Sequence, residues 1–246
     1  MTTIDIQLAR PRRRAETLEA IARDASKRLA QSSTHDIVAW AAAEFGSSLA
    51  VASSMQDAVL THVVSAQVPG VDVLFLDTGY HFTETLGTRD AVAATMPVNV
   101  VSVLPELTVA EQDAQYGPRL HDRDPAACCR MRKVEPLTRA LAGYEAWVTG
   151  VRREESETRA NTPAVTWDSG HGLVKVNPLV AWTAEQVEEY AESYGVLSNA
   201  LLQDGYPSIG CEPCTRRVAP GEDSRAGRWS GMEKTECGIH GGDYSI

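Results

Sequence analysis

The sequence predicts an α/β fold in which a parallel sheet carries helices on both faces. Three observations lead to this prediction. Short apolar runs of strand length alternate along the chain with longer stretches of helical periodicity. The apolar runs are nearly continuous, as expected of strands that are buried on both faces. Several of them end in small or hydroxyl residues, which is typical of the edge where such sheets bind ligands.

The elements can be assigned in order along the chain. Strands are expected at the apolar runs 49–54, 71–79, 98–104 and 144–150. Helices are expected where apolar residues recur at three-to-four spacing, over residues 15–30, 36–45, 57–68, 82–95 and 126–142. A last helix follows Thr183, whose spacing to Gln186 is that of a capping box, and runs to about Tyr194.

The stretch after Leu202 is rich in Gly, Pro and charged residues and has little apolar periodicity. Such a stretch either is mobile or is held by something other than a core. A chain of 246 residues is compatible with one domain. We therefore interpret residues 1–246 as a single α/β domain with residues 203–246 as a C-terminal tail.

Composition and charge limit the classes of partner. The net charge of −10 argues against a general nucleic-acid binder, which needs an excess of Lys and Arg. No apolar run approaches the roughly 18–20 residues of a membrane span, and the N-terminus lacks the apolar core of a secretory signal. We expect a cytoplasmic protein with no membrane partner. The stretch Pro11–Arg14 is interpreted as a solvated lead-in to the first helix, in preference to an anion-binding arm.

The cationic residues are unevenly distributed. Ten of the 23 Lys and Arg residues fall in three short stretches, namely Arg130, Arg132 and Lys133; Arg152, Arg153 and Arg159; and Arg216, Arg217, Arg225 and Arg228. A cluster of cations on an acidic protein suggests a local site for a small polyanion.

Four of the five cysteines form two close pairs. Cys211 and Cys214 have the C-x-x-C spacing that lets two thiolates converge on one metal centre. Cys128 and Cys129 are adjacent, so on a helix their side chains diverge by about 100°. A multi-iron cluster suits such a pair better than one zinc ion, and four thiolates are the usual complement of a four-iron cluster. Zinc, disulfides and inert core thiols remain alternatives.

Cys237 is the fifth cysteine and lies nine residues before Ile246, between Glu236 and Gly238. A structural thiol would be expected among apolar residues, whereas this neighbourhood is polar. A thiol reacts through its thiolate, which nearby cations and solvent access favour. We interpret Cys237 as a nucleophile on a tail able to reach a substrate and a second protein; an incidental exposed cysteine is the alternative.

Several segments of the chain resemble one enzyme family. They are CCRMRKVEPL (128–137), GCEPC (210–214) and ECGIH (236–240), with LDTGYHF (76–82), WVTGVRREESETR (147–159), VNPLVAWT (176–183) and GRWSG (227–231) as further matches. In this order they closely resemble assimilatory adenylyl-sulfate reductases, thioredoxin-dependent bacterial enzymes with a four-iron cluster. The resemblance covers about residues 36–241, and it implies a fold similar to the adenine-nucleotide α-hydrolases.

The resemblance implies roles for the cysteines. Cys128, Cys129, Cys211 and Cys214 would hold one [4Fe-4S] cluster. Cys237 would attack the sulfur of adenosine 5′-phosphosulfate, release AMP and become S-sulfonated. Thioredoxin would then free sulfite from that adduct.

The resemblance also implies substrate contacts. Lys133 matches the family's lysine between cluster and substrate. Arg159, Arg225 and Arg228 match arginines that would bind phosphate and sulfate oxygens, for which the guanidinium is well shaped. The residues expected to border the nucleotide are Ser53, Leu76, Thr78 and Gly150.

The phosphate loop departs from the family pattern. Many relatives have a Ser-Gly-Ala-Glu-Asp-like run, and here Ser54 stands in place of the glycine and Gln56 in place of the acidic residue.

Three alternatives are open. A 3′-phosphoadenylyl-sulfate reductase would share fold and nucleophile, but such enzymes usually lack the paired cysteines. A phosphate-loop ATP pyrophosphatase that modifies RNA would need an intact SGGxDS-type loop and a basic surface. A metal-stabilised binding module would leave Cys237 and the arginines unexplained.

Overall fold

One sheet organises the part of the chain that the computed structural model describes, which is residues 12–232, 234 and 238–239. Within these residues six strands form it, namely β1 (Leu49–Ala52), β2 (Val71–Leu76), β3 (Val98–Val103), β4 (Ala146–Val148), β5 (Val165–Asp168) and β6 (Leu173–Val176). Their order is β3-β2-β1-β4-β6-β5, and only β5 runs antiparallel to its neighbour. The predicted α/β fold with a mainly parallel sheet is confirmed.

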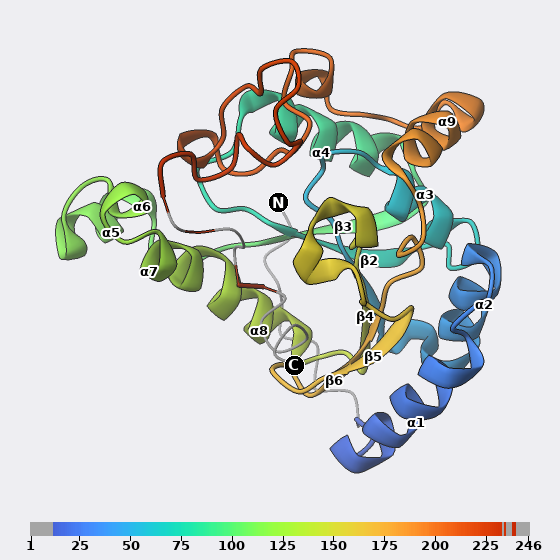
Figure 1. The fold of residues 1–246 in the computed structure, drawn as a ribbon. Coiled ribbons are helices and arrows are strands. Elements are labelled where there is room, and N and C mark those ends of the chain that lie inside the picture. The colour runs from blue at the N-terminus through green and yellow to red at the C-terminus, as the bar shows by residue number, and fades with distance from the viewer. Residues whose placement is uncertain (1–11, 233, 235–237, 240–246) are drawn as a thin grey trace.

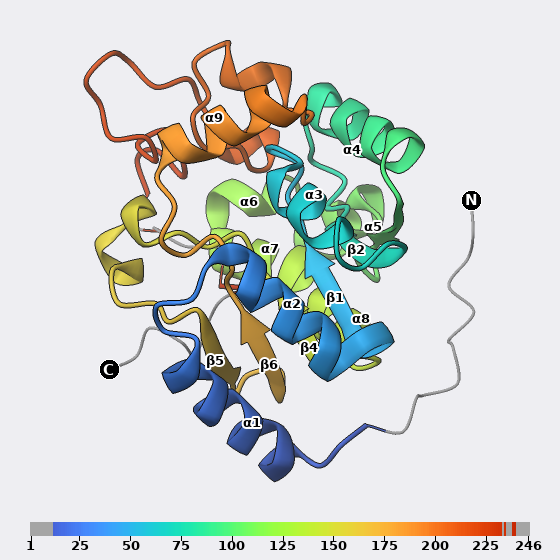
Figure 2. The ribbon, with the colours of Figure 1, turned by 90° about the vertical axis from the view of Figure 1, so that its right-hand side faces the viewer.

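Helices cover both faces of this sheet (Figures 1 and 2). Those described are α1 (Ala15–Arg28), α2 (Thr34–Phe45), α3 (Val59–Ser65), α4 (Thr83–Thr95), α5 (Val109–Tyr116), α6 (Leu120–Arg123), α7 (Pro125–Cys129), α8 (Glu135–Leu141) and α9 (Ala184–Tyr194). Buried residues of α1, α2, α3, α4 and α9 share one core cluster, and α8 packs on the opposite face. None of these helices is long and apolar enough to cross a membrane.

Successive side chains of a strand point to opposite faces of the sheet, so β1 and β2 each contribute residues to both hydrophobic cores. Val51 and Val73 belong to the core under α1–α3, whereas Ala50 and Leu74 belong to the core under α8. All four are at most 1% exposed. Double burial explains why these strands read as continuous apolar runs.

The sheet has a switch point between β1 and β4. From β1 the chain adds β2 and β3 on one side, and β4 then pairs with the other side of β1. Ligands of open α/β sheets bind outside the carboxyl ends of the strands at such a point. Ser53 follows β1 there, and Thr149 and Gly150 follow β4.

The β5–β6 hairpin is an element that the sequence analysis missed. Lys175 lies in the middle of β6 and is 0% exposed, with its ammonium 5.3 Å from the centre of the Trp147 ring. A lysine is a poor sequence signal for a buried strand, because charged residues are rarely fully buried. Both strands also have only four residues each.

The N-terminal arginine stretch is also not a purely solvated lead-in. The Arg13 guanidinium pairs with the carboxylates of Glu44 and Glu145, and the Arg13 backbone N–H donates to Glu145 at 2.6 Å. Arg13 also lies over the Phe45 ring at 5.2 Å. These contacts fasten the start of α1 to the amino-terminal edge of the sheet.

We predict that Arg13→Ala lowers the free energy of unfolding by about 1–2 kcal/mol at neutral pH, because charge-assisted hydrogen bonds are lost. Burial raises the pKa of Glu145, but the hydrogen bonds from Arg13 outweigh it and hold that pKa below its usual value. The contribution of Glu145 is therefore present above its unfolded pKa of about 4.3 and lost as the pH falls through the folded value. Denaturant unfolding across this range measures both effects.

The control for Arg13→Ala is Arg23→Ala, which removes an exposed i,i+4 pair with Glu19. It should cost less than about 0.5 kcal/mol. Equal losses in the two variants would contradict the role given to Arg13.

Candidate functional site

The first cysteine pair lies at the end of α7. The helix begins after Asp124, whose side chain accepts from Ala127 N–H at 2.8 Å, and Pro125 occupies its first turn. Cys128 and Cys129 are its last residues and are each 7% exposed. A π-helical turn, Arg130–Val134, then joins α7 to α8. Such turns are rare and frequently occur at functional sites.

The second pair lies on a short turn that neighbouring segments hold in place. Cys214 N–H donates to Cys211 C=O at 3.0 Å, which closes the turn. Glu212 N–H donates to Tyr80 C=O at 2.8 Å, and Trp229 N–H donates to Cys214 C=O at 3.0 Å. The Thr78 hydroxyl lies 3.3 Å from Cys211 Sγ. The turn is thus tied both to the loop after β2 and to the C-terminal segment.

The four thiols line one cavity, together with Tyr80, His121, Arg132 and Lys133. Burial, together with the charges of the other three cysteines, raises the pKa of Cys128 to about 12. Burial and Cys211 likewise raise the pKa of Cys214 to about 11. Four thiolates here would therefore repel one another unless a cationic group lay between them.

The donor set has the chemistry of a group that four thiolates bind. Among the residues that the structure describes, no group of three or more Cys, His, Asp or Glu side chains is arranged to hold one metal ion. Those residues also contain no disulfide between the four cysteines. Four thiols around a shared cavity suit a larger group with separate thiolate sites.

Arg132 is a buried cation beside this cavity that the sequence analysis counted but gave no role. Its side chain donates to the Thr78 carbonyl and, at 2.9 Å, to Gln112 Oε1. Its guanidinium lies 5.2 Å from the centre of the Tyr80 ring. Arg132 is 3% exposed and lowers the pKa of Cys128 through its charge. Its position in CCRMRK was the available signal.

Lys133 and Arg228 flank the second cysteine pair. Lys133 lines the cavity, and the charges of Lys133 and Arg228 both lower the pKa of Cys214, against the larger effect of burial. Arg228 donates to Ser208 Oγ at 3.2 Å and Ile209 C=O at 3.4 Å. The Arg228 guanidinium lies directly over Gly210, so it would have to shift if residue 210 carried a Cβ.

The loop after β1 reaches the same region. Ser53 Oγ accepts from Met55 N–H at 3.2 Å, and Met55 has a φ of 58°, so the left-handed residue of this loop is not a glycine. Gln56 Oε1 accepts from Ile209 N–H at 2.9 Å. The amide that replaces the expected acidic residue therefore ties the phosphate loop to the segment under Arg228.

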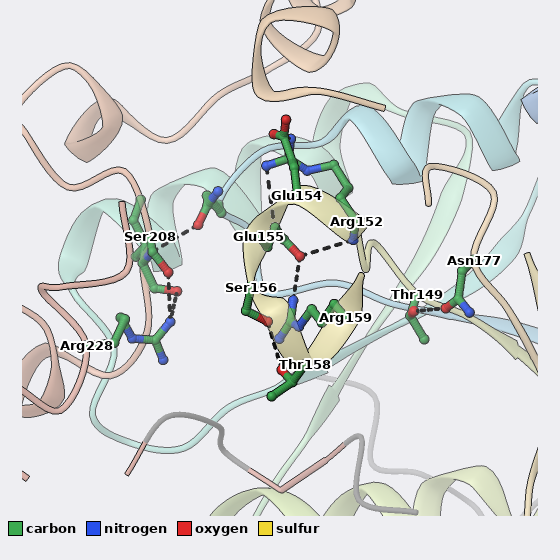
Figure 3. A network of polar contacts seen from close by, with 12 residues as sticks. Thr149, Arg152, Glu154, Glu155, Ser156, Thr158, Arg159, Asn177, Ser208 and Arg228 are labelled. Carbon is green, nitrogen blue, oxygen red and sulfur yellow. Dashed lines mark hydrogen bonds and ion pairs between the residues drawn. The ribbon is translucent and has the colours of Figure 1, made fainter. Parts of the chain in front are cut away.

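Arg159 lies in the segment that joins β4 to β5. It is 6% exposed and pairs with Glu155, which also contacts Arg152 (Figure 3). The charges of Arg152 and Glu155 act on the pKa of Asp57, which burial raises. Residues 152–159 therefore approach the residue that ends the phosphate loop. The sequence analysis gave no role to Arg152 or Glu155.

The other predicted contacts lie at strand ends. The Leu76 carbonyl lies 2.8 Å from His81 Nε2. Thr78 is 0% exposed, and its hydroxyl faces Cys211. Gly150 is exposed after β4, and Arg225 lies in the turn that precedes Arg228.

Cys237 lies outside the described residues. Gly238 and Ile239 are described, and Ile239 packs against the core under α8. A Cβ on Gly238 would lie 3.7 Å from Val134, the residue after Lys133.

Comparison with known proteins gives consistent likenesses. Residues 47–217 match the phosphoadenosine phosphosulfate reductase domain. The chain is 59% identical to an adenosine 5′-phosphosulfate reductase of Streptomyces coelicolor, over 93% of this chain and 97% of that protein. It is 56% identical to a protein of the same name from Mycolicibacterium smegmatis, over 91% of this chain and 94% of that protein.

Solved structures are similar as well. A phosphoadenylyl-sulfate reductase from Candida auris, in a phosphate complex, is 26% identical with a TM-score of 0.67, covering 79% of this chain and 96% of that one. An FMN adenylyltransferase from Candida glabrata is 9% identical with a TM-score of 0.54, covering 83% and 76%. The second likeness concerns the fold alone.

Proposed function

The chain belongs to the phosphoadenosine phosphosulfate reductase domain family, and from that premise we propose that it reduces adenosine 5′-phosphosulfate to sulfite in sulfate assimilation. The observation that carries this proposal is the cavity of four thiols beside Lys133 and Arg228. Relatives that are more than half identical over most of the chain have the same activity in their names.

We infer that Cys128, Cys129, Cys211 and Cys214 hold one [4Fe-4S] cluster. Support comes from their shared cavity and from the mutual repulsion that their thiolates would otherwise have. When bound, the cluster supplies a charged, polarisable group that tunes the electrostatics beside the substrate. The thiols must stay reduced to bind it, which accords with a cytoplasmic location.

The chain's own cations then bind the anion. Lys133 and Arg228, whose charges act on Cys214, and Arg159, which Glu155 holds, are suited to the phosphate and sulfate oxygens. Arg225 adds a further cation in the turn before Arg228. Together these residues offset the repulsion that a chain of net charge −10 would exert on the substrate.

The nucleotide would lie at the switch point of the sheet. Ser53 and Gly150 follow the two strands that border it, β1 and β4, and Leu76 ends β2. The Thr78 hydroxyl is directed at Cys211, so this residue supports the cysteine turn as well as the nucleotide edge.

Cys237 is proposed as the nucleophile. Its thiolate attacks the sulfate sulfur, the bond from sulfur to the bridging oxygen breaks, and AMP leaves with the electron pair. A thioredoxin thiolate then attacks Cys237 Sγ and releases sulfite, and the second thioredoxin thiol resolves the mixed disulfide. Two thiols of thioredoxin are oxidised and one sulfur atom is reduced by two electrons, so the steps balance.

A 3′-phosphoadenylyl-sulfate reductase is the second candidate, because the family name and the Candida auris structure refer to that substrate. The two substrates differ by one phosphate group, on the 3′ position of the nucleotide. The edge of the sheet already holds Asp57 and Glu155 near its cations, and an added dianion without its own cations would be unfavourable.

We predict that catalytic efficiency favours adenosine 5′-phosphosulfate over its 3′-phosphorylated form by at least about 100-fold. The measurement is kcat/KM for sulfite release with thioredoxin, on protein purified without oxygen and containing about four irons per chain. Protein with Cys237→Ser gives the background rate. Equal or higher efficiency with the 3′-phosphorylated substrate would transfer the chain to the second candidate.

A further inference from the structure

Glu155 lies between the side chains of Arg152 and Arg159 (Figure 3). One of its oxygens accepts from Arg159 Nη1, and the same oxygen accepts from the Arg152 backbone N–H at 3.1 Å. Its other oxygen lies 3.7 Å from Arg152 Nη2. The carboxylate is therefore held by the main chain while it contacts the Arg159 side chain.

The loop around Glu155 is fixed to the rest of the protein. Arg153 N–H donates to Val180 C=O at 3.0 Å, and Arg153 Nε donates to Thr162 C=O at 2.9 Å. Thr162 N–H in turn donates to Arg159 C=O at 2.9 Å. Glu155 and Arg159 are thus both anchored through their own backbone segments, so the contact between them has a defined geometry.

The Arg159 and Glu155 side chains are largely buried, so the geometry of their contact affects how Arg159 can bind an anion. The Arg159 side chain is 7% exposed and the Glu155 side chain 21% exposed. A buried guanidinium binds an oxyanion well only if its donors already point at the oxygens, because the ordering cost is then met before binding. Glu155 holds Nη1 of Arg159, which fixes the orientation of the guanidinium.

We propose that Glu155 is a positioning residue, which orients the Arg159 guanidinium toward the phosphate or sulfate oxygens of the substrate. The inference rests on the proposed function, in which Arg159 binds the anion. A carboxylate near an anion site is unfavourable by its charge alone, so its contribution must come from the hydrogen bond that orients Arg159.

Two substitutions separate orientation from charge. Glu155→Gln keeps an oxygen acceptor for Arg159 and removes the negative charge, whereas Glu155→Ala removes both. Dissociation constants for AMP are measured by calorimetry on anaerobically prepared, iron-loaded protein, and KM and kcat are measured with adenosine 5′-phosphosulfate.

The expected result is that Glu155→Ala weakens AMP binding by roughly tenfold and raises KM with little change in kcat. The dissociation constant of Glu155→Gln for AMP should be no more than about threefold above the wild-type value. Tighter binding in both variants would show that Glu155 acts only by its charge, and it would overturn the proposal.

The matched control is Glu154→Ala. Glu154 is the neighbouring residue, it pairs with Arg152 at 2.6 Å, and its side chain is 38% exposed. The Glu154→Ala substitution should leave AMP affinity and KM unchanged. A loss equal to that of Glu155→Ala would mean that any carboxylate of this turn is equivalent, and this too would overturn the proposal.

A double-mutant cycle tests whether Glu155 acts through Arg159. In an Arg159→Ala background, Glu155→Ala should cause no further loss of AMP affinity. An additional loss of the same size would indicate a general structural role and overturn the inference, while the loss in Arg159→Ala itself would leave the proposed function standing. Unchanged affinity in Arg159→Ala would instead remove Arg159 from the proposed site, and the inference with it.

Discussion

Replacement of Cys237 by serine is expected to abolish sulfite production, with a loss of at least about a thousandfold in kcat. The serine hydroxyl stays protonated at neutral pH and is a far weaker nucleophile than a thiolate. Iron content and AMP affinity should remain close to the wild-type values, because the four cavity cysteines and the cations beside them are unchanged. Anaerobic turnover with thioredoxin, iron analysis and AMP titration measure the three properties.

The covalent adduct gives a direct test of the same role. Wild-type protein given adenosine 5′-phosphosulfate without thioredoxin should gain one sulfonate, and mass spectrometry of its peptides should locate the group on Cys237. The control is Thr235→Ser, which alters the same segment without removing a thiol and should keep full activity. A sulfonate on another cysteine, or turnover by Cys237→Ser, would contradict the mechanism even if the fold and the cluster were correct.

Replacement of Cys128 or Cys214 by serine is expected to remove iron and to destabilise the protein together. These thiols lie on segments that the cavity brings together, so metal binding there contributes to the folding free energy. We expect loss of most of the iron and a melting temperature lower by more than about 5 °C, equivalent to about 1–2.5 kcal/mol or more for a chain of this size. Iron analysis and anaerobic thermal unfolding provide the measurements.

Cys237→Ser is the matched control for this pair of variants, since it makes the same chemical change at a cysteine that the proposal does not assign to the cluster. It should retain its iron and its melting temperature. Full iron content with normal melting in either Cys128→Ser or Cys214→Ser would show that the assigned ligand is wrong.

Much of the fold could be predicted because it depends on local patterns. The strand at residues 49–52 is apolar along its whole length and the strand at residues 71–76 at every position but Asp72, as double burial favours. The long helix that begins at Pro125 was predicted within one residue at its start. The β5–β6 hairpin was missed because Lys175 is buried against Trp147, a contact that only the assembled sheet creates.

The site, like the fold, has features that the sequence predicts and features that it does not. The cysteine pairs were visible from spacing, and the structure brings their thiols to one cavity. Gln56 contacts Ile209, and Glu155 contacts Arg159. The hydrophobic periodicity of the sequence predicts neither contact. Arg132 was visible as a cation, but its burial against Tyr80 depends on the packing of the loop after β2.

The π-helical turn at Arg130–Val134 determines how one helical segment can face both the hydrophobic core and the second cysteine pair. A π turn holds one residue more than an α turn would, so it is equivalent to a single-residue insertion in an otherwise continuous helix. Its effect is to rotate everything on one side by about 100° relative to the other. Leu137 and Leu141 keep their places in the core while Cys128 and Cys129 turn toward the opposite cysteine pair. If the same residues formed a regular α-helix without this turn, Cys128 and Cys129 would face away from their partners whenever α8 kept its hydrophobic register, whereas deleting one residue of the turn would remove the bulge and leave both faces in place.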